Sequence, residues 1–220
     1  MDKCSPRVES NMGMTVTGIT EISGTRMKIE IDYEFAFVLY KGELHHYHVR
    51  EGEEITETDY HTIMTEVLPK RAKLRCMNLL KSREYTTQQL RRKLMQGGYP
   101  EAVAEEALNY VASFHYTDDL RYATDYIASR QHVKSRRWIE QHLYSKGISG
   151  DLIAQAWQKL QAQGGTREEY SVVQQLLAKK NYHPESADLK EKRRIYAYLL
   201  RKGYSHETIR QAMADYNIVY

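Results

Sequence analysis

The 220-residue sequence has few cysteines, few prolines and no long hydrophobic run. Its two cysteines form no Cys-x-x-Cys pair, which argues against a disulfide framework and fits a reducing compartment. The longest apolar run, residues 35–40, is far shorter than the roughly 20 residues that cross a membrane. The polar first residues lack the apolar stretch of a secretory signal. We therefore expect a soluble cytoplasmic protein without a membrane partner.

Catalytic and metal-binding motifs are missing as well. The sequence has no phosphate loop, no GxGxxG, no HExxH and no GxSxG. Asp118 and Asp119 stand at a predicted helix start, where acids satisfy free N–H groups, and no third ligand accompanies them. His45, His46 and His48 fall in a predicted strand, which leaves at most two of them on one face. We expect no enzyme activity, no metal site and no cofactor.

Charge is divided unevenly along the chain. The formal net charge of +3 combines −7 over residues 1–69 with +10 over residues 70–220. Such asymmetry indicates a polyanionic partner for the basic part, although Lys and Arg also cover ordinary solvated helices. Nucleic acid or an acidic protein surface fits this charge.

The N-terminal region has the composition of a small sheet. Segments rich in β-branched and aromatic residues lie at 16–22, 27–31, 35–40 and 44–49, with turn residues between them. We expect a flexible tail over residues 1–14, followed by a small antiparallel sheet within a β-rich region over 15–69. A short helix capped by Thr58 or Asp59 is expected to end before Pro69.

Three later stretches share a leucine, three further residues, a glycine and a large apolar residue. They occupy residues 94–99, 143–148 and 199–204. A glycine after the last helical turn adopts the left-handed conformation at no steric cost, and the next residue packs back on the leucine. Each stretch therefore predicts a helix C-terminus, and three occurrences indicate a repeat.

The glycines Gly98, Gly147 and Gly203 stand 49 and 56 residues apart and set the register of this repeat. Thr86 and Gln89 form a capping box before the first of these helices. Helical spacing predicts three tandem three-helix repeats over residues 70–115, 116–164 and 165–220. The register aligns two sets of core positions, Ala107 with Ala156 and Ala212, and Val111 with Leu160 and Tyr216. We expect a mainly α fold whose repeats form an elongated array, a shape that favours binding over catalysis.

These features resemble the RecX family of regulatory proteins. The stretches that carry the resemblance lie at residues 83–99, 116–130 and 137–148. Two mild departures are Gln89, where the family favours an acid, and Ser135, where it often has glycine. The resemblance implies a modulator of RecA that binds RecA and its filament on single-stranded DNA. It also implies suppression of RecA ATPase and strand exchange, in DNA repair and the SOS response.

The candidate contact residues are basic side chains in or beside the second helix of each repeat. They are Arg91, Arg92, Lys93, Lys134, Arg136, Arg137, Lys146, Lys192, Arg193, Arg194, Arg201 and Lys202. A face built from them would bind phosphates of single-stranded or double-stranded DNA, or acidic side chains of a protein filament. The competing interpretation is an ordinary solvated helix surface. We expect the protein to act as a monomer.

Other function classes rest on the same basic residues. One alternative is a stand-alone nucleic-acid-binding protein without sequence specificity, and another is a scaffold for a different acidic protein. Tyrosines are able to stack on bases, and Tyr122 and Tyr126 stand one helical turn apart. Because tyrosines at helical spacing are mostly core or half-buried residues, the sequence predicts no stacking platform. The role of the acidic sheet stays open.

Overall fold

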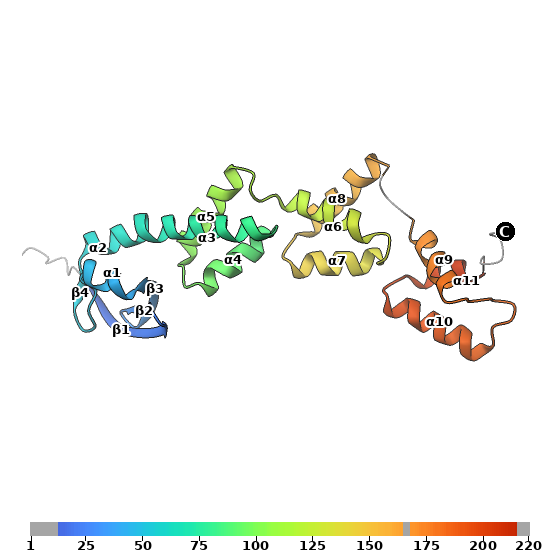
Figure 1. Cartoon of the computed structure of the whole chain (residues 1–220), viewed down its shortest axis with the longest axis horizontal. Coiled ribbons are helices and arrows are strands. Elements are labelled where there is room, and N and C mark those ends of the chain that lie inside the picture. Colours follow the sequence, from blue (N-terminus) through green and yellow to red (C-terminus); the bar gives the residue numbers. More distant parts are fainter. Residues whose placement is uncertain (1–12, 165–167, 215–220) are drawn as a thin grey trace, which may run out of the picture. The chain divides into compact units, whose positions relative to one another are not determined.

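The computed structural model describes residues 13–164 and 168–214 (Figure 1). The chain divides into two compact units. The first comprises the residues up to 83 together with 90–116, and the second comprises 84–89 together with the residues from 117 onward. Most of the predicted tail lies outside the described residues, and the first strand already begins at Met14. None of the described helices is long and apolar enough to cross a membrane.

An antiparallel sheet forms in the N-terminal region, as predicted. Its strands are β1 (Met14–Ser23), β2 (Arg26–Ile31), β3 (Glu34–Tyr40) and β4 (Glu54–Ile55). The strand order is β3-β2-β1-β4. Ile29 of β2 lies opposite Ile19 of β1 and Phe37 of β3, and Ile29 and Phe37 are fully buried. The buried face therefore follows the alternation of apolar and charged residues in β2.

The predicted strand over residues 44–49 is wrong, because helix α1 (Lys41–His46) follows β3 directly. The Glu43 carboxylate accepts a hydrogen bond from the Tyr40 backbone N–H at 2.7 Å and closes the first helical turn. This local cap outweighs the β-propensity of the segment. The histidines at 45 and 46 consequently lie in a helix, and His48 adopts a positive φ of 53°.

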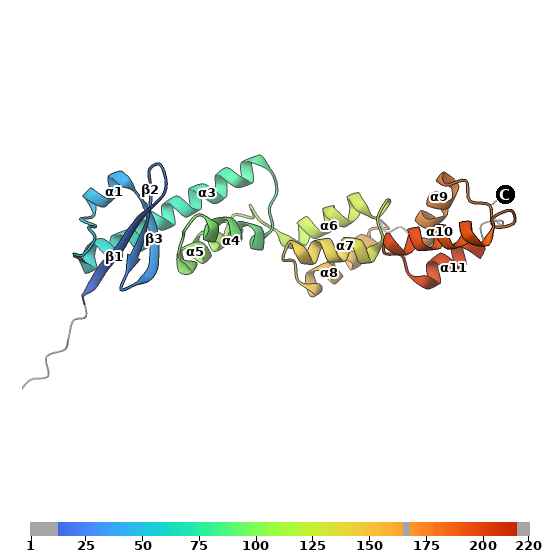
Figure 2. The ribbon, with the colours of Figure 1, turned by 90° about the horizontal axis from the view of Figure 1, so that it is seen from below.

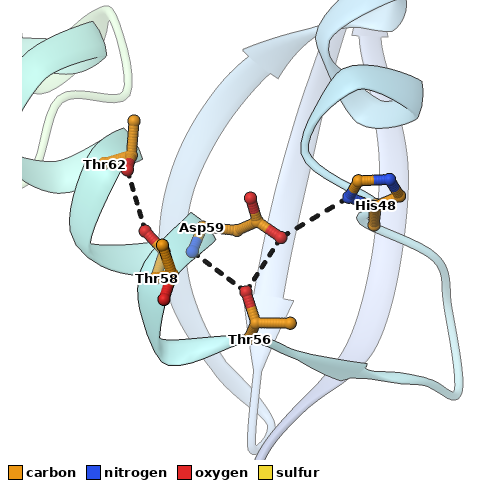
Figure 3. A network of polar contacts seen from close by, with 5 residues as sticks. All are labelled: His48, Thr56, Thr58, Asp59 and Thr62. Atoms are coloured by element: carbon orange, nitrogen blue, oxygen red, sulfur yellow. Dashed lines mark hydrogen bonds and ion pairs between the residues drawn. The ribbon is translucent and has the colours of Figure 1, made fainter.

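The helix that follows α1 begins earlier than predicted, and Figure 3 shows the polar contacts at its first turn. Helix α2 (Glu57–Thr62) is capped by Thr56, whose hydroxyl accepts a hydrogen bond from the Asp59 N–H at 3.0 Å. The same hydroxyl donates to the Asp59 carboxylate at 2.8 Å, and His48 Nδ1 lies 3.5 Å from that carboxylate. The predicted cap, Thr58 or Asp59, is therefore wrong, since Thr56 is the residue with extended backbone.

The chain also stays helical through Pro69, contrary to the prediction. A wide turn of π-helix, η1 (Ile63–Val67), connects α2 to α3 (Leu68–Ser82). Pro69 lies in the first turn of α3, where its missing N–H removes no regular helical hydrogen bond. The change of hydrogen-bond register in η1 thus lets the helix accommodate the proline.

Three sets of three helices follow the sheet (Figures 1 and 2). They are α3 to α5 (with α4 Thr87–Gln96 and α5 Glu101–Ser113), α6 to α8 (Asp119–Arg130, Arg136–Ser145 and Gly150–Ala162), and α9 to α11 (Glu169–Lys179, Leu189–Arg201 and His206–Ala214). In each set the first helix packs against the third. The aligned alanines Ala107, Ala156 and Ala212 are fully buried, which confirms the predicted register. Tyr216, predicted as core, lies outside the described residues.

All three leucine–glycine stops adopt the predicted helix end. Gly98, Gly147 and Gly203 have φ of +80°, +86° and +89°. In each stop the N–H after the glycine donates to the leucine carbonyl at 3.2–3.3 Å, and the glycine N–H donates to the next carbonyl at 2.9–3.0 Å. These are the two hydrogen bonds of the Schellman motif. The leucines and the residues that follow the glycines are buried.

The stops also receive a contact that the sequence does not predict. The carbonyl before each glycine accepts a hydrogen bond from a side chain of another segment. The pairs are the Arg26 guanidinium with Gly97, the Thr86 hydroxyl with Lys146 at 2.7 Å, and the Ser135 hydroxyl with Lys202 at 2.8 Å. A Cβ atom placed on Gly203 would lie 2.6 Å from the Ser135 hydroxyl, so the neighbouring segment leaves no space for a side chain. The glycines therefore serve packing as well as backbone conformation.

Candidate cation and aromatic surface

The predicted basic residues fall into three groups, and the first group is neutralised locally. Arg91 pairs with Glu105 at 2.6 Å, Arg136 with Glu140 at 2.7 Å, and Arg194 with Glu191 at 3.3 Å. The hydrogen bond to Glu105 raises the pKa of Arg91 above its usual range. These guanidiniums already have carboxylate partners and are weaker candidates for contacts with a polyanion.

The second group is exposed on the helix surfaces. It consists of Arg92, Lys93, Arg137, Lys192, Arg193 and Arg201. Consecutive residues on a helix point in directions about 100° apart, so the three basic residues of the run 192–194 fan over about 200° and only some of them can face one partner.

The third group lies over aromatic rings. Lys134 Nζ is 4.4 Å from the centre of the Trp138 ring, and Lys146 Nζ is 5.8 Å from that of Tyr122. Lys202 Nζ is 5.1 Å from the centre of the Tyr198 ring. Such cation–π contacts hold an ammonium group in place without neutralising its charge. This group identifies the surface that we regard as the candidate site.

Four rings of the second repeat form a row, here called the aromatic row. It runs Tyr122–Tyr126–His142–Trp138, with centroid separations of 6.4, 5.6 and 4.9 Å. The planes of neighbouring rings differ by at most 12°. Tyr122 and Tyr126 come from α6, and His142 and Trp138 come from α7, so the packing of the two helices aligns the rings. His142 is exposed and the other three are half-buried.

Positive charge surrounds this row. Arg130 lies 5.9 Å from the centre of the Tyr126 ring, in addition to Lys134 and Lys146. Within the described part of the chain, none of these three cations forms an ion pair. Although His142 is exposed, partial desolvation of its ring lowers its pKa, and the charges of Lys146, Arg130 and Lys134 lower it further. The row therefore carries an uncompensated positive charge that a polyanion would neutralise.

Part of this arrangement recurs in the third repeat. The Tyr198 ring lies 5.1 Å from both Lys180 Nζ and Lys202 Nζ. In the glycine register, Tyr198 and Lys202 are equivalent to His142 and Lys146, 56 residues earlier. Lys180 is the C-cap residue of α9, and Arg130 is the last residue of α6. The third repeat thus places one ring of its middle helix close to two cations, whereas in the second repeat the cations lie over Tyr122 and Tyr126 of α6 and Trp138 of α7.

Sequence reasoning found only part of this surface. It named Lys134, Lys146 and Lys202 among many cations. It missed five members, Arg130, Trp138, His142, Lys180 and Tyr198. The available signal is the four-residue spacing of Trp138 and His142 in α7 and of Lys146, which follows the end of that helix. The sequence also shows Tyr122 and Tyr126 as a pair, and the expectation that such tyrosines are core or half-buried does not by itself point to a surface; both are half-buried.

The fold and this surface together define a class of protein. Three-helix repeats carrying cations and stacked rings are suited to bind a partner through surface contacts. Among residues 13–164 and 168–214, no group of three or more His, Cys, Asp or Glu side chains is placed to hold a metal ion. Asp118 caps α6 by accepting from the Arg121 N–H at 2.8 Å, and Asp119 accepts from the Thr87 N–H at 2.9 Å. These acids therefore have structural roles.

Comparison with known proteins identifies the family. The chain matches the first, second and third three-helix domains of RecX over residues 72–110, 118–156 and 167–213. It belongs to the RecX family of regulatory proteins. The regulatory protein RecX of Clostridium acetobutylicum is 27% identical over 195 residues, which cover 86% of this chain and 89% of that protein. The RecX of Mycobacterium ulcerans is 31% identical over 138 residues, or 62% and 79% of the two chains.

Solved structures agree on the fold. A crystal structure of a regulatory protein RecX superimposes with a TM-score of 0.57 and 21% identity, over 90% of this chain and 98% of the other. The crystal structure of RecX from Lactobacillus salivarius gives a TM-score of 0.58 and 18% identity, over 70% of this chain and 99% of that chain. These similarities support the tandem three-helix architecture.

Proposed function

We propose that this protein binds RecA and its filament on single-stranded DNA, and lowers the ATPase and recombinase activity of RecA in DNA repair and the SOS response. Membership of the RecX family supports a regulatory role, and the resemblance to that family supports RecA as the partner. The observation that carries the proposal is the aromatic row with its three unpaired cations, together with the related arrangement around Tyr198.

This surface suits a nucleoprotein filament for two physical reasons. Lysine and arginine side chains that neutralise phosphates release bound counterions, which favours binding. Aromatic rings stack on unpaired bases of any sequence, which contributes about 1–3 kcal/mol per base. A protein that binds one state of the filament more tightly than another shifts the population toward that state. Preference for a state that cannot complete the ATP cycle lowers ATP hydrolysis.

The same surface also supports the alternative of a stand-alone binder of single-stranded or double-stranded nucleic acid. Five cations lie at the two ring sites, at positions 130, 134, 146, 180 and 202. If each contacts one phosphate of a single strand, the slope of log K against log salt would reach about −3.5. Tight binding of bare strands with such a slope, and no effect on RecA, would favour this alternative.

A charge-reversal pair tests the proposed surface. We expect Lys134→Glu with Lys146→Glu to weaken binding to RecA filaments on single-stranded DNA at least tenfold, measured by fluorescence anisotropy of labelled protein. The control is Lys159→Glu with Lys190→Glu, which makes the same change in net charge at exposed positions of α8 and α10 outside the row. Equal weakening in both pairs would mean that only net charge matters, and it would contradict a specific site.

A further inference from the structure

The first unit contains a small cavity walled by arginines. Its volume is about 100 Å³, and Arg26, Arg71 and Arg75 contribute to its lining together with Tyr40 and Tyr99. No aspartate or glutamate belongs to the lining formed by the described residues. A water molecule needs only about 10–15 Å³ of such space. The cavity therefore has room for a small polyatomic ion or one ionised group of a larger ligand.

Two of the arginines are held in place by the fold. The Arg26 guanidinium of β2 donates to the Gly97 carbonyl, at the end of α4. Arg71 of α3 donates to the Val38 carbonyl at 3.3 Å and pairs with the Glu43 carboxylate. Its guanidinium also lies 4.5 Å from the centre of the Tyr40 ring. Guanidiniums fixed in this way lose little further entropy when they bind a ligand.

The third arginine of the cavity, Arg75, has a guanidinium group that is available for a ligand. Arg75 follows Arg71 by one helical turn on α3, is exposed, and forms no ion pair with the residues that the structure describes. A guanidinium carries five N–H donors, and Arg26 and Arg71 together use three of theirs on Gly97, Val38 and Glu43. Several charged donors are thus available around one small space.

The electrostatics at Tyr99 support this convergence. Tyr99 is 7% exposed, and burial raises the pKa of its hydroxyl. Arg71, Arg75 and Arg26 each act in the opposite direction, because each positive charge favours the phenolate. All three guanidiniums line the same cavity as Tyr99, and each favours a negative charge on the Tyr99 hydroxyl. The cavity is therefore favourable for an anion.

We propose that this cavity binds a single phosphate group, either as inorganic phosphate or as the phosphate of a nucleotide. Three guanidiniums and the neighbouring Glu43 leave a local charge of +2, which matches a phosphate of −1.5 to −2 at pH 7 better than a carboxylate of −1. Arginine forks match phosphate oxygens in bidentate geometry. The cavity is small, and the region over residues 1–69 carries −7, so a long polyanion is disfavoured there.

Calorimetric titration of the full-length protein with sodium phosphate tests this proposal, at constant ionic strength and without RecA or nucleic acid. We expect saturation at one phosphate per chain. Adenosine 5′-monophosphate and adenosine form two further arms. Tighter binding of the nucleotide than of inorganic phosphate identifies a nucleotide as the source, and the reverse order identifies the free ion. Adenosine alone is expected not to bind.

Arg75→Ala should weaken phosphate binding at least tenfold, whereas Lys70→Ala, which removes an exposed charge from the same helix, should leave it unchanged. If Arg75→Ala lowers the melting temperature, Arg75→Lys replaces it, because lysine keeps the charge and loses the fork. Binding that does not saturate, equal binding by the wild type and both Arg75 variants, or equal binding of adenosine and its monophosphate would overturn the proposal.

Discussion

The side chains of Arg130, Lys134 and Lys146 approach the aromatic row from three places in the second repeat. Each contacts a ring, and none of them pairs with a carboxylate of the described residues. Cation–π contacts contribute roughly 0.5–1 kcal/mol at exposed sites, which is enough to orient a lysine without occupying all of its donors. These three cations are thus oriented in advance, as the proposed binding of an anionic partner requires.

Trp138 is the residue whose loss should separate stacking from charge. We expect Trp138→Ala to weaken binding to single-stranded DNA, alone or in the RecA filament, by about 1–3 kcal/mol, because one stacking ring is removed and no charge changes. Tyr144→Ala, an exposed ring on the same helix but outside the row, serves as the control. Binding that is insensitive to Trp138→Ala but sensitive to salt would show that phosphates alone are contacted.

His142 gives the row a pH dependence. Partial desolvation of the ring and the three neighbouring cations hold the pKa of His142 below 6.5, so the native chain binds fewer protons than the unfolded chain as the pH falls through this range. Native stability should therefore decrease as the pH drops from above 6.5 through the lowered pKa. Bound phosphates favour the imidazolium, so single-stranded DNA should raise the pKa of His142. NMR titration of the imidazole protons with and without single-stranded DNA measures the pKa of His142, and urea unfolding at several pH values measures the change in stability. A free-protein pKa above 6.5 would contradict the assignment.

At the scale of the element, the leucine–glycine stops explain where the middle helix of each repeat ends. They also explain how the ends of α7 and α10 contact the start of the preceding repeat's middle helix. The Thr86 and Ser135 hydroxyls each cap the start of a middle helix and also donate to the carbonyl before a glycine of the second unit. One side chain therefore satisfies a helix start and a helix end. The sequence of a single repeat cannot predict this hydrogen bond, because the hydroxyl and the carbonyl belong to residues 60 or 67 positions apart.

Replacing Gly147 separates backbone strain from packing. Gly147 and Gly52 have similar φ, +86° and +82°, but only Gly147 has neighbours, the Gln88 side chain, where a Cβ would lie. Gly52→Ala should lower the free energy of unfolding by about 1–2 kcal/mol, because alanine is strained in the left-handed conformation. Gly147→Ala should lower it by about 1–3 kcal/mol more, because the added methyl group overpacks the contact with Gln88. Urea unfolding measures both, and equal losses would disprove the packing role.

At the scale of the whole molecule, sequence periodicity predicted the sheet, the three sets of helices and the stops, because each rests on local signals such as alternation, capping and left-handed glycine. The prediction is wrong at residues 44–49, where the cap formed by Glu43 favours a helix over a strand. It is also wrong at Pro69, where the π-helical turn η1 lets the helix continue. The candidate surface was only partly predictable. The candidate lysines are the ones that lie over rings from both α6 and α7. Tertiary packing of the two helices aligns these rings, and the spacing within one helix does not reveal it.

The most direct test of the regulatory account is ATP hydrolysis by RecA on single-stranded DNA, measured while this protein is added from substoichiometric to excess amounts. The account predicts a fall in the hydrolysis rate that begins below one protein per RecA, because one bound molecule biases the state of neighbouring filament subunits. A rate that stays unchanged over the whole titration would contradict it.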